Sequence, residues 1–194
     1  FVIPNGINSL FYERNYIKKN SSKKKIIYFG RIHEKKGIEI LLKAIKELPK
    51  SYFEKYIFEI TGPGETAYIN KISKMIKEFE INKFVTMLSP KTGDDKIDYL
   101  LNSDVFVLPS YEEGDSIALK EAMSAQNAVI ISEQCRLDLV EKKKAGFIIK
   151  TEKESLKSAL LKLDNYSIEK MGNNSKKIIQ KYFDNDYCAD RVFK

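Results

Sequence analysis

The stretch that decides the fold is KIIYFGRIHEKKGIEILLKAIKEL, residues 25–48. It begins with a short apolar run, passes through a loop bounded by two glycines, and continues with apolar residues at steps of three and four. The first part is typical of a buried strand and the last part of an amphipathic helix. This order predicts the opening unit of a parallel α/β sheet.

The same alternation of short apolar runs and helical periods continues along the chain. Strands are expected near residues 25–29, 56–61, 84–88, 105–108, 128–132 and 147–149, and helices over 38–48, 69–79, 97–101, 117–125 and 156–163, before a helical tail from residue 167. Strands joined by such helices run parallel with right-handed crossovers. The sequence therefore predicts one α/β domain with a Rossmann-like parallel sheet covered by helices.

Composition excludes several classes of protein. The chain has 194 residues, of which 43% are hydrophobic and 11% aromatic, so it is expected to fold around one core. No apolar run reaches the roughly 18 to 20 residues that span a bilayer. Cys135 and Cys188 stand far apart and outside any metal-binding spacing, so neither a metal site nor a disulfide framework is expected. The lack of a disulfide framework makes a reducing cytosol the simpler assumption. The chain opens on Phe1 without a signal segment, which favours a piece of a longer protein.

The net charge of +7 leaves the partner open. Lysine runs such as residues 23–25 and 142–144 suit anionic small molecules, anionic lipid or nucleic acid about equally well, and solvated lysine is the plainer explanation. No aromatics are interleaved with the basic residues as in base-stacking proteins, so nucleic acid is not expected. A peripheral contact with the inner membrane surface is compatible with the lysines, and plain solubility explains the same residues.

Two loops that follow strands carry the candidate site residues. Gly30 permits close backbone approach, Arg31 presents a planar fork suited to phosphate, and Lys36 adds a second cation before the next helix. Glu113 follows the strand at 105–108, and Glu121 lies eight positions later in the following helix. Because ligands of open α/β sheets bind outside the carboxyl ends of the strands, these groups are expected at one crevice. Cations for a diphosphate and carboxylates for sugar hydroxyls predict a nucleotide-sugar site.

Weaker signals surround these four residues. Gly62 and Gly64 lie in a further loop on the same side, which is also an ordinary turn. Ser116 is expected to cap the helix that carries Glu121. His33, the only histidine, is interpreted as a solvated loop residue because no partner for nucleophilic or metal chemistry is visible. Exposed cations and a solvated helical glutamate remain the plain alternatives for the main four.

The ordered set of motifs resembles the retaining GT-B glycosyltransferases of family 4, the glycosyl transferases group 1. The matching segments are Val2-Ile3-Pro4-Asn5-Gly6-Ile7, Phe29-Gly30-Arg31 with Lys36-Gly37, Thr61-Gly62-Pro63-Gly64, Val107-Leu108-Pro109-Ser110, and Glu113 to Glu121 with Ala122-Met123. The resemblance covers residues 1 to about 150. It implies the C-terminal, donor-binding half of such an enzyme.

The resemblance also implies roles for single residues. Arg31 and Lys36 would stabilise the diphosphate as it leaves, Glu113 would contact the transferred sugar, and Glu121 would hold the ribose hydroxyls. The loop residues Gly30, Gly62 and Gly64 would line the donor, and the amides of Ser116 and Ile117 would face its diphosphate or sugar. The donor would be a nucleotide sugar such as a UDP- or GDP-sugar, and no cofactor or metal would be required.

Two departures from the family pattern bear on the donor. Residues 114–116 read Gly-Asp-Ser where the family commonly has Gly-Phe-Gly or Gly-Phe-Pro, so an acid replaces an aromatic residue. Residues 126–129 read Gln-Asn-Ala-Val where the family often has Gly-x-Pro-Val. Both changes leave the charged residues in place and put the identity of the donor sugar in question.

These expectations combine into one reading of the chain. Residues 1–24 are expected to connect domains, 25–165 to form the nucleotide-sugar-binding domain, and 166–194 to form a C-terminal helical tail. A missing N-terminal half would bind the glycan or glycolipid acceptor, so the 194 residues alone are expected to transfer hexose poorly or not at all. A non-catalytic Rossmann-like module that binds nucleic acid or membrane is the alternative.

Overall fold

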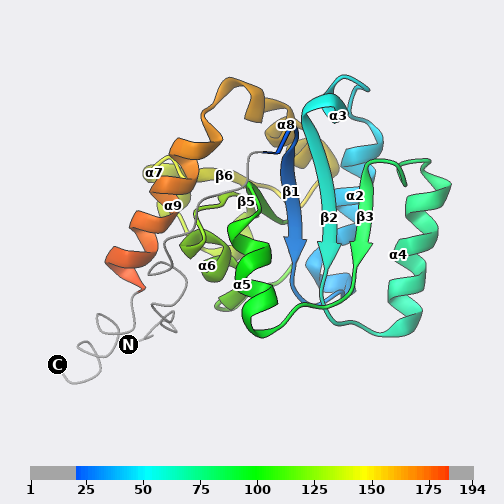
Figure 1. Ribbon diagram of the computed structural model, residues 1–194, viewed down its shortest axis with the longest axis horizontal. Coiled ribbons are helices and arrows are strands. Elements are labelled where there is room, and N and C mark those ends of the chain that lie inside the picture. Colours follow the sequence, from blue (N-terminus) through cyan, green and yellow to red (C-terminus); the bar gives the residue numbers. More distant parts are fainter. Residues whose placement is uncertain (1–20, 184–194) are drawn as a thin grey trace.

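A six-stranded parallel sheet forms the centre of the computed structural model, which describes residues 21–183 (Figure 1). The strand order is β3-β2-β1-β4-β5-β6, and each neighbouring pair is parallel. The strands are β1 (Lys24–Phe29), β2 (Tyr56–Thr61), β3 (Val85–Leu88), β4 (Val105–Leu108), β5 (Ala128–Ser132) and β6 (Gly146–Ile149). The predicted Rossmann-like sheet is confirmed, with strand bounds within one residue of those expected.

The central strands are apolar because helices cover both of their faces. All residues of β4 and β5 are buried, and β1 is buried from Ile26 to Phe29. A strand that is buried on both faces has a continuous run of apolar residues, and such runs made each strand recognisable in the sequence. The register pairs Ile26 of β1 with Val105 of β4 and with Phe58 of β2, so the carboxyl ends of these strands lie at one edge.

Two layers of helices flank the sheet. In one layer α2 (Ile38–Lys46) packs against α4 (Thr66–Glu78) and α8 (Lys153–Lys162). In the other, α6 (Ile117–Ser124) packs against α5 (Gly93–Leu101) and α9 (Ile168–Tyr182). Figure 1 shows α2 behind the strands and α5 in front of them. Each layer thus covers one face, as expected for a doubly wound sheet.

Several short elements escaped the sequence analysis. The one-turn helices α3 (Tyr52–Lys55) and α7 (Leu139–Lys142) are too short to show a period, and the 3₁₀ turns η1 (Glu34–Lys36), η2 (Glu133–Cys135) and η3 (Leu163–Asn165) lie in expected loops. The helical tail is present as α9, which packs on β5 and α6 and buries Met171, Ile178 and Ile179. The proposed domain limits stay a prediction, and residues 1–20 and 184–194 lie outside the described residues.

The junction after α6 accommodates one of the departures from the family pattern. Gln126, which stands where the family often has glycine, adopts a left-handed backbone with φ of 61°. Gly172 of α9 packs there, since a Cβ at Gly172 would lie 2.0 Å from the carbonyl oxygen of Gln126. The side chain of Asn127 donates to the carbonyl of Leu100 at 2.9 Å and ties the end of α5 to this junction.

Candidate functional site

The loops that follow β1 and β2 lie against each other at the carboxyl edge of the sheet. Gly30 N donates to Thr61 O at 3.1 Å, and Ile32 N donates to Pro63 O at 2.7 Å. Gly62 has φ of 151°, and a Cβ on it would lie 1.8 Å from Gly30 O. Only glycine fits so close to a neighbouring backbone, so the sequence Gly-Pro-Gly here is more than an ordinary turn.

The loops that follow β1 and β4 are also joined through their backbones. Gly37 has φ of 68°, and a Cβ on it would lie 1.9 Å from Pro109 O. Tyr111 N donates to Lys35 O at 2.8 Å. The Ser110 hydroxyl lies 2.9 Å from the carbonyls of Lys35 and of Glu112 and can donate to one of them at a time. The loop with Lys36 is therefore fixed relative to the loop with Glu113.

Lys36 and Glu113 contact each other directly. Lys36 Nζ lies 2.6 Å from Glu113 Oε1, across 77 positions of sequence. The side chain of Glu113 is only 6% exposed, and that of Lys36 is 25% exposed. A charge-assisted bond of this length compensates a carboxylate that burial would otherwise destabilise. Of the four main residues predicted for the site, the structure brings these two together.

A second pair repeats this contact at the surface. Lys35 Nζ lies 2.6 Å from Glu112 Oε2, and both side chains are exposed. The hydrogen bond from Lys35 lowers the pKa of Glu112. The pair adds a side-chain link between the two loops that the backbone already joins.

Arg31 lies in the same loop as Lys36, and its side chain is exposed. Among residues 21–183 its guanidinium has no hydrogen-bond or ion-pair partner, so it forms no ion pair with Glu113 or Glu121. Its backbone is held in place, because the hydroxyl of Tyr28 donates to Arg31 O at 2.6 Å. Burial raises the pKa of Tyr28, and the charge of Glu113 raises it further, so this hydroxyl stays protonated as a donor.

Helix α6 begins beside these loops and carries Glu121. Ser116 caps it as expected, with Oγ accepting from Leu119 N at 3.4 Å, and the Ile117 side chain is exposed. Glu121 Oε1 lies 2.6 Å from Lys96 Nζ of α5, and the two side chains are 11% and 26% exposed. Glu121 is thus a largely buried carboxylate paired with a lysine that the sequence analysis had not singled out.

Asp115, the acid in place of the family's aromatic residue, also has a cationic partner. It forms an ion pair with Lys120, which is 4% exposed. Lys120 Nζ also lies 4.8 Å from the centre of the Phe183 ring, at the end of α9. The acid at position 115 is therefore paired with a buried lysine, Lys120, in the first turn of α6.

Further residues that the sequence analysis missed support the loops. Ser132 Oγ donates to Ser110 O at 2.6 Å, and Thr151 Oγ1 lies 2.7 Å from Gln134 Oε1 and 3.2 Å from Ser110 O. These side chains come from the ends of β5 and β6. Their positions after predicted strands were the available signal, since the carboxyl ends of parallel strands meet at one edge.

Neither His33 nor Cys135 is arranged for nucleophilic chemistry. His33 Nδ1 accepts from Lys35 N at 3.2 Å and caps the 3₁₀ turn η1, and its side chain stays partly exposed, as expected for a loop residue. Cys135 is a free thiol near Ser132, and burial raises its pKa to about 11. A thiol with so high a pKa carries little thiolate near neutral pH and is a poor nucleophile.

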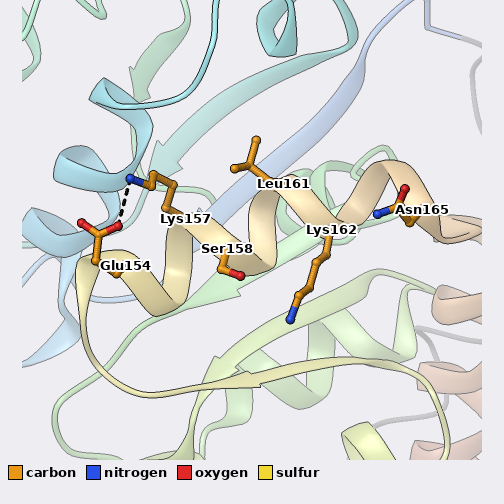
Figure 2. A pocket seen from close by; sticks show the side chains of 6 residues that line it. All are labelled: Glu154, Lys157, Ser158, Leu161, Lys162 and Asn165. Carbon is orange, nitrogen blue, oxygen red and sulfur yellow. Dashed lines mark ion pairs between the residues drawn. The ribbon is translucent and has the colours of Figure 1, made fainter.

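The hollow in Figure 2 lies apart from these loops. It has a volume of about 320 Å³ and is lined by residues of α8 and η3. Figure 2 shows Lys157 paired with Glu154 at one end of it. None of the predicted site residues lines this hollow.

The part of the chain that the structure describes holds neither a metal-binding cluster nor a membrane-spanning helix. Within residues 21–183, no group of three or more His, Cys, Asp and Glu side chains is arranged to hold a metal ion. In the same range, no helix combines the length and the apolar character needed to cross a bilayer.

Residues 12–178 match the family model described as glycosyl transferases group 1. A relative in Escherichia coli, the putative colanic acid biosynthesis glycosyltransferase WcaL, is 26% identical over 151 residues, which cover 74% of this chain and 36% of that protein. The chain spans less than half the length of the curated relatives it matches.

Two solved structures share the fold. The C-terminal domain of the group 1 glycosyl transferase LpcC from Francisella tularensis superposes with a TM-score of 0.75 at 18% identity, covering 95% of this chain and 97% of that one. HepE from Anabaena, in complex with UDP and glucose, gives a TM-score of 0.83 at 18% identity, covering 100% of this chain and 55% of that one. At these identities the likeness shows the fold alone.

Proposed function

Because the chain belongs to the glycosyl transferases group 1 family and has the parallel sheet of one half of a GT-B fold, we propose that it binds the donor of a glycosyltransferase. The donor is a nucleotide sugar such as a UDP- or GDP-sugar. The observation that carries this proposal is the 2.6 Å contact between Lys36 and Glu113. It brings a cation and a carboxylate from two separate loops to one point at the carboxyl edge, where α/β sheets bind ligands.

The cations of the loop after β1 are assigned to the diphosphate. Arg31 is exposed and presents a planar fork for phosphate oxygens, and Lys36 supplies a point charge. Both would stabilise negative charge that develops on the leaving nucleotide. Since Lys36 is paired with Glu113 in the structure, a bound diphosphate would compete with Glu113 for this ammonium. Gly30 would let the donor approach the backbone, and Gly62 and Gly64, which pack against the backbones of Gly30 and Ile32, would shape the loop beside the donor.

The carboxylates are assigned to hydroxyl groups. Glu113 would accept hydrogen bonds from the transferred sugar, and Glu121 would accept them from the ribose. The amides at the start of α6, around Ser116 and Ile117, would face the diphosphate or the sugar, because a helix N-terminus carries unpaired donors. HepE, crystallised with UDP and glucose, supports a donor of this class.

The transferred sugar, the acceptor and the place of the reaction can also be proposed. We propose transfer of a hexose with retention to a polysaccharide, lipopolysaccharide or glycolipid, in the cytoplasm and at the inner membrane surface when the acceptor is lipid-linked. The name of the colanic acid relative supports a polysaccharide acceptor. The 194 residues alone would transfer sugar poorly or not at all, because transfer requires an acceptor held beside the donor.

Calorimetric titration of the chain with UDP, GDP and their sugars tests the donor site. Arg31→Ala and Glu121→Ala are each expected to weaken nucleotide binding about tenfold or more, since each removes a charged partner of the ligand. Glu154→Ala, in the hollow on α8, is the matched control and should bind like the parent.

Two results would contradict the assignment. Parent-like affinity in both site variants would remove Arg31 and Glu121 from the site. Binding to DNA or anionic vesicles that persists at high salt and ignores nucleotide sugars would favour a non-catalytic module, the alternative suggested by the net charge of +7.

A further inference from the structure

Lys96 approaches the proposed ribose site from a helix that the donor assignment does not use. It is the fourth residue of α5, the helix that begins shortly after β3 and so starts at the same carboxyl edge as α6. Its ammonium lies 2.6 Å from Glu121 Oε1. The contact joins the two helices on either side of β4 in the sequence, 25 positions apart.

The burial of Glu121 makes its contact with Lys96 important for the carboxylate. The Glu121 side chain is 11% exposed, so its carboxylate has lost most of its contact with water. An unpaired carboxylate in such a place is unfavourable, and a lysine at hydrogen-bond distance compensates it. The same contact restricts rotation of the carboxylate group, because one of its two oxygens is fixed to α5.

We propose that Lys96 is a positioning residue for ribose recognition. By holding Oε1 of Glu121, Lys96 orients the carboxylate so that it can accept hydrogen bonds from the ribose hydroxyls. Lys96 acts through Glu121 and contacts no reacting atom. The inference rests on the proposed function, because it assumes that Glu121 binds the ribose of a nucleotide.

A comparison of UDP with 2′-deoxy-UDP tests this role. The parent should prefer UDP, because 2′-deoxy-UDP lacks one of the hydroxyls that Glu121 is assigned to bind. Lys96→Met should lower the affinity for UDP about tenfold and the affinity for 2′-deoxy-UDP much less. The preference for the ribonucleotide would then be largely lost. Lys96→Arg, which keeps the charge and a donor, should retain it.

Lys157→Met is the matched control. Lys157 Nζ also lies 2.6 Å from a glutamate, Glu47 Oε2, and its side chain is 25% exposed, close to the 26% of Lys96. It belongs to α8 in the opposite helical layer, so its loss should leave both affinities unchanged. If Lys96→Met does not fold, as judged by circular dichroism, Lys96→Gln is measured in its place.

The outcomes separate this inference from the proposed function. Equal loss of affinity for both nucleotides in Lys96→Met would show a purely structural role and overturn the inference. Affinities for both nucleotides that match those of the parent would also overturn it. The guanosine pair, GDP and 2′-deoxy-GDP, replaces the uridine pair if the parent binds only GDP. A parent that binds neither UDP nor GDP would overturn the proposed function itself.

Discussion

The pair Lys36–Glu113 at the carboxyl edge and the pair Lys157–Glu47 on the outer helices have the same N–O distance of 2.6 Å and equally exposed lysines. Their carboxylates differ, because Glu113 is 6% exposed and Glu47 is 37% exposed. Glu47 also accepts from Lys153. Because the two distances are equal, we expect the burial of the carboxylate, and not the length of the ion pair, to decide what each pair contributes to stability.

The two pairs also differ in what holds them. Backbone hydrogen bonds and the close contact of Gly37 with Pro109 fix the loops that carry Lys36 and Glu113. Lys157 and Glu47 project from helices α8 and the end of α2 into solvent, where long side chains lose entropy on pairing. A fixed, buried pair suits a site where a ligand must find charges already in position.

The largest expected effect is on stability when the lysine of the buried pair is removed. Lys36→Met leaves the Glu113 carboxylate buried without its partner and is expected to lower the free energy of unfolding by about 3 kcal/mol, the low end for a broken buried pair because Lys36 is 25% exposed. Lys157→Met should cause no resolvable change, because Glu47 keeps Lys153 and water. Urea unfolding of both variants measures the difference. Equal stability losses in the two variants would break the comparison.

The sequence predicted which loops lie side by side for a physical reason. Parallel strands end at one edge, so residues after β1 and β4 had to lie close together, and Lys36 and Glu113 do. Arg31 lies in the same loop, but its guanidinium is exposed and has no ion-pair partner among residues 21–183, so a shared loop does not predict a shared ion pair.

Other features could not be predicted because they depend on packing between helices. The contact of Lys96 with Glu121 requires the relative placement of α5 and α6, and no periodicity encodes the rotamers that join them. The cap made by His33 depends on a turn of three residues, which is too short for a pattern. The fold could be predicted from the period of the hydrophobic residues. The partners of these side chains could be identified only from the three-dimensional structure.

A second change should restore part of the stability lost by Lys36→Met. In Lys36→Met combined with Glu113→Gln no buried charge remains unpaired, so the double variant should recover about 1 to 2 kcal/mol relative to Lys36→Met. The matching double change, Lys157→Met with Glu47→Gln, has no buried charge to relieve and should show no recovery. Urea titrations of the parent, the single variants, Glu113→Gln and Glu47→Gln included, and the double variants provide the coupling energies. A double variant less stable than Lys36→Met would mean that loss of packing, and not the unpaired carboxylate, causes the destabilisation.

The smallest effect is expected from pH at the exposed pair. Hydrogen bonds from Lys153 and Lys157 lower the pKa of Glu47 from 4.5 to about 2 in the folded chain. A lowered pKa adds stability that is complete above the unfolded value and is lost as pH falls from about 4.5 towards 2. The difference in urea midpoint between the parent and Glu47→Gln should therefore be constant above pH 5 and shrink between pH 4.5 and pH 3. Solvent screening of the exposed charges keeps this difference in urea midpoint small. In a background of Lys153→Met and Lys157→Met the pH dependence should vanish, and its persistence there would show that the two lysines are not its cause.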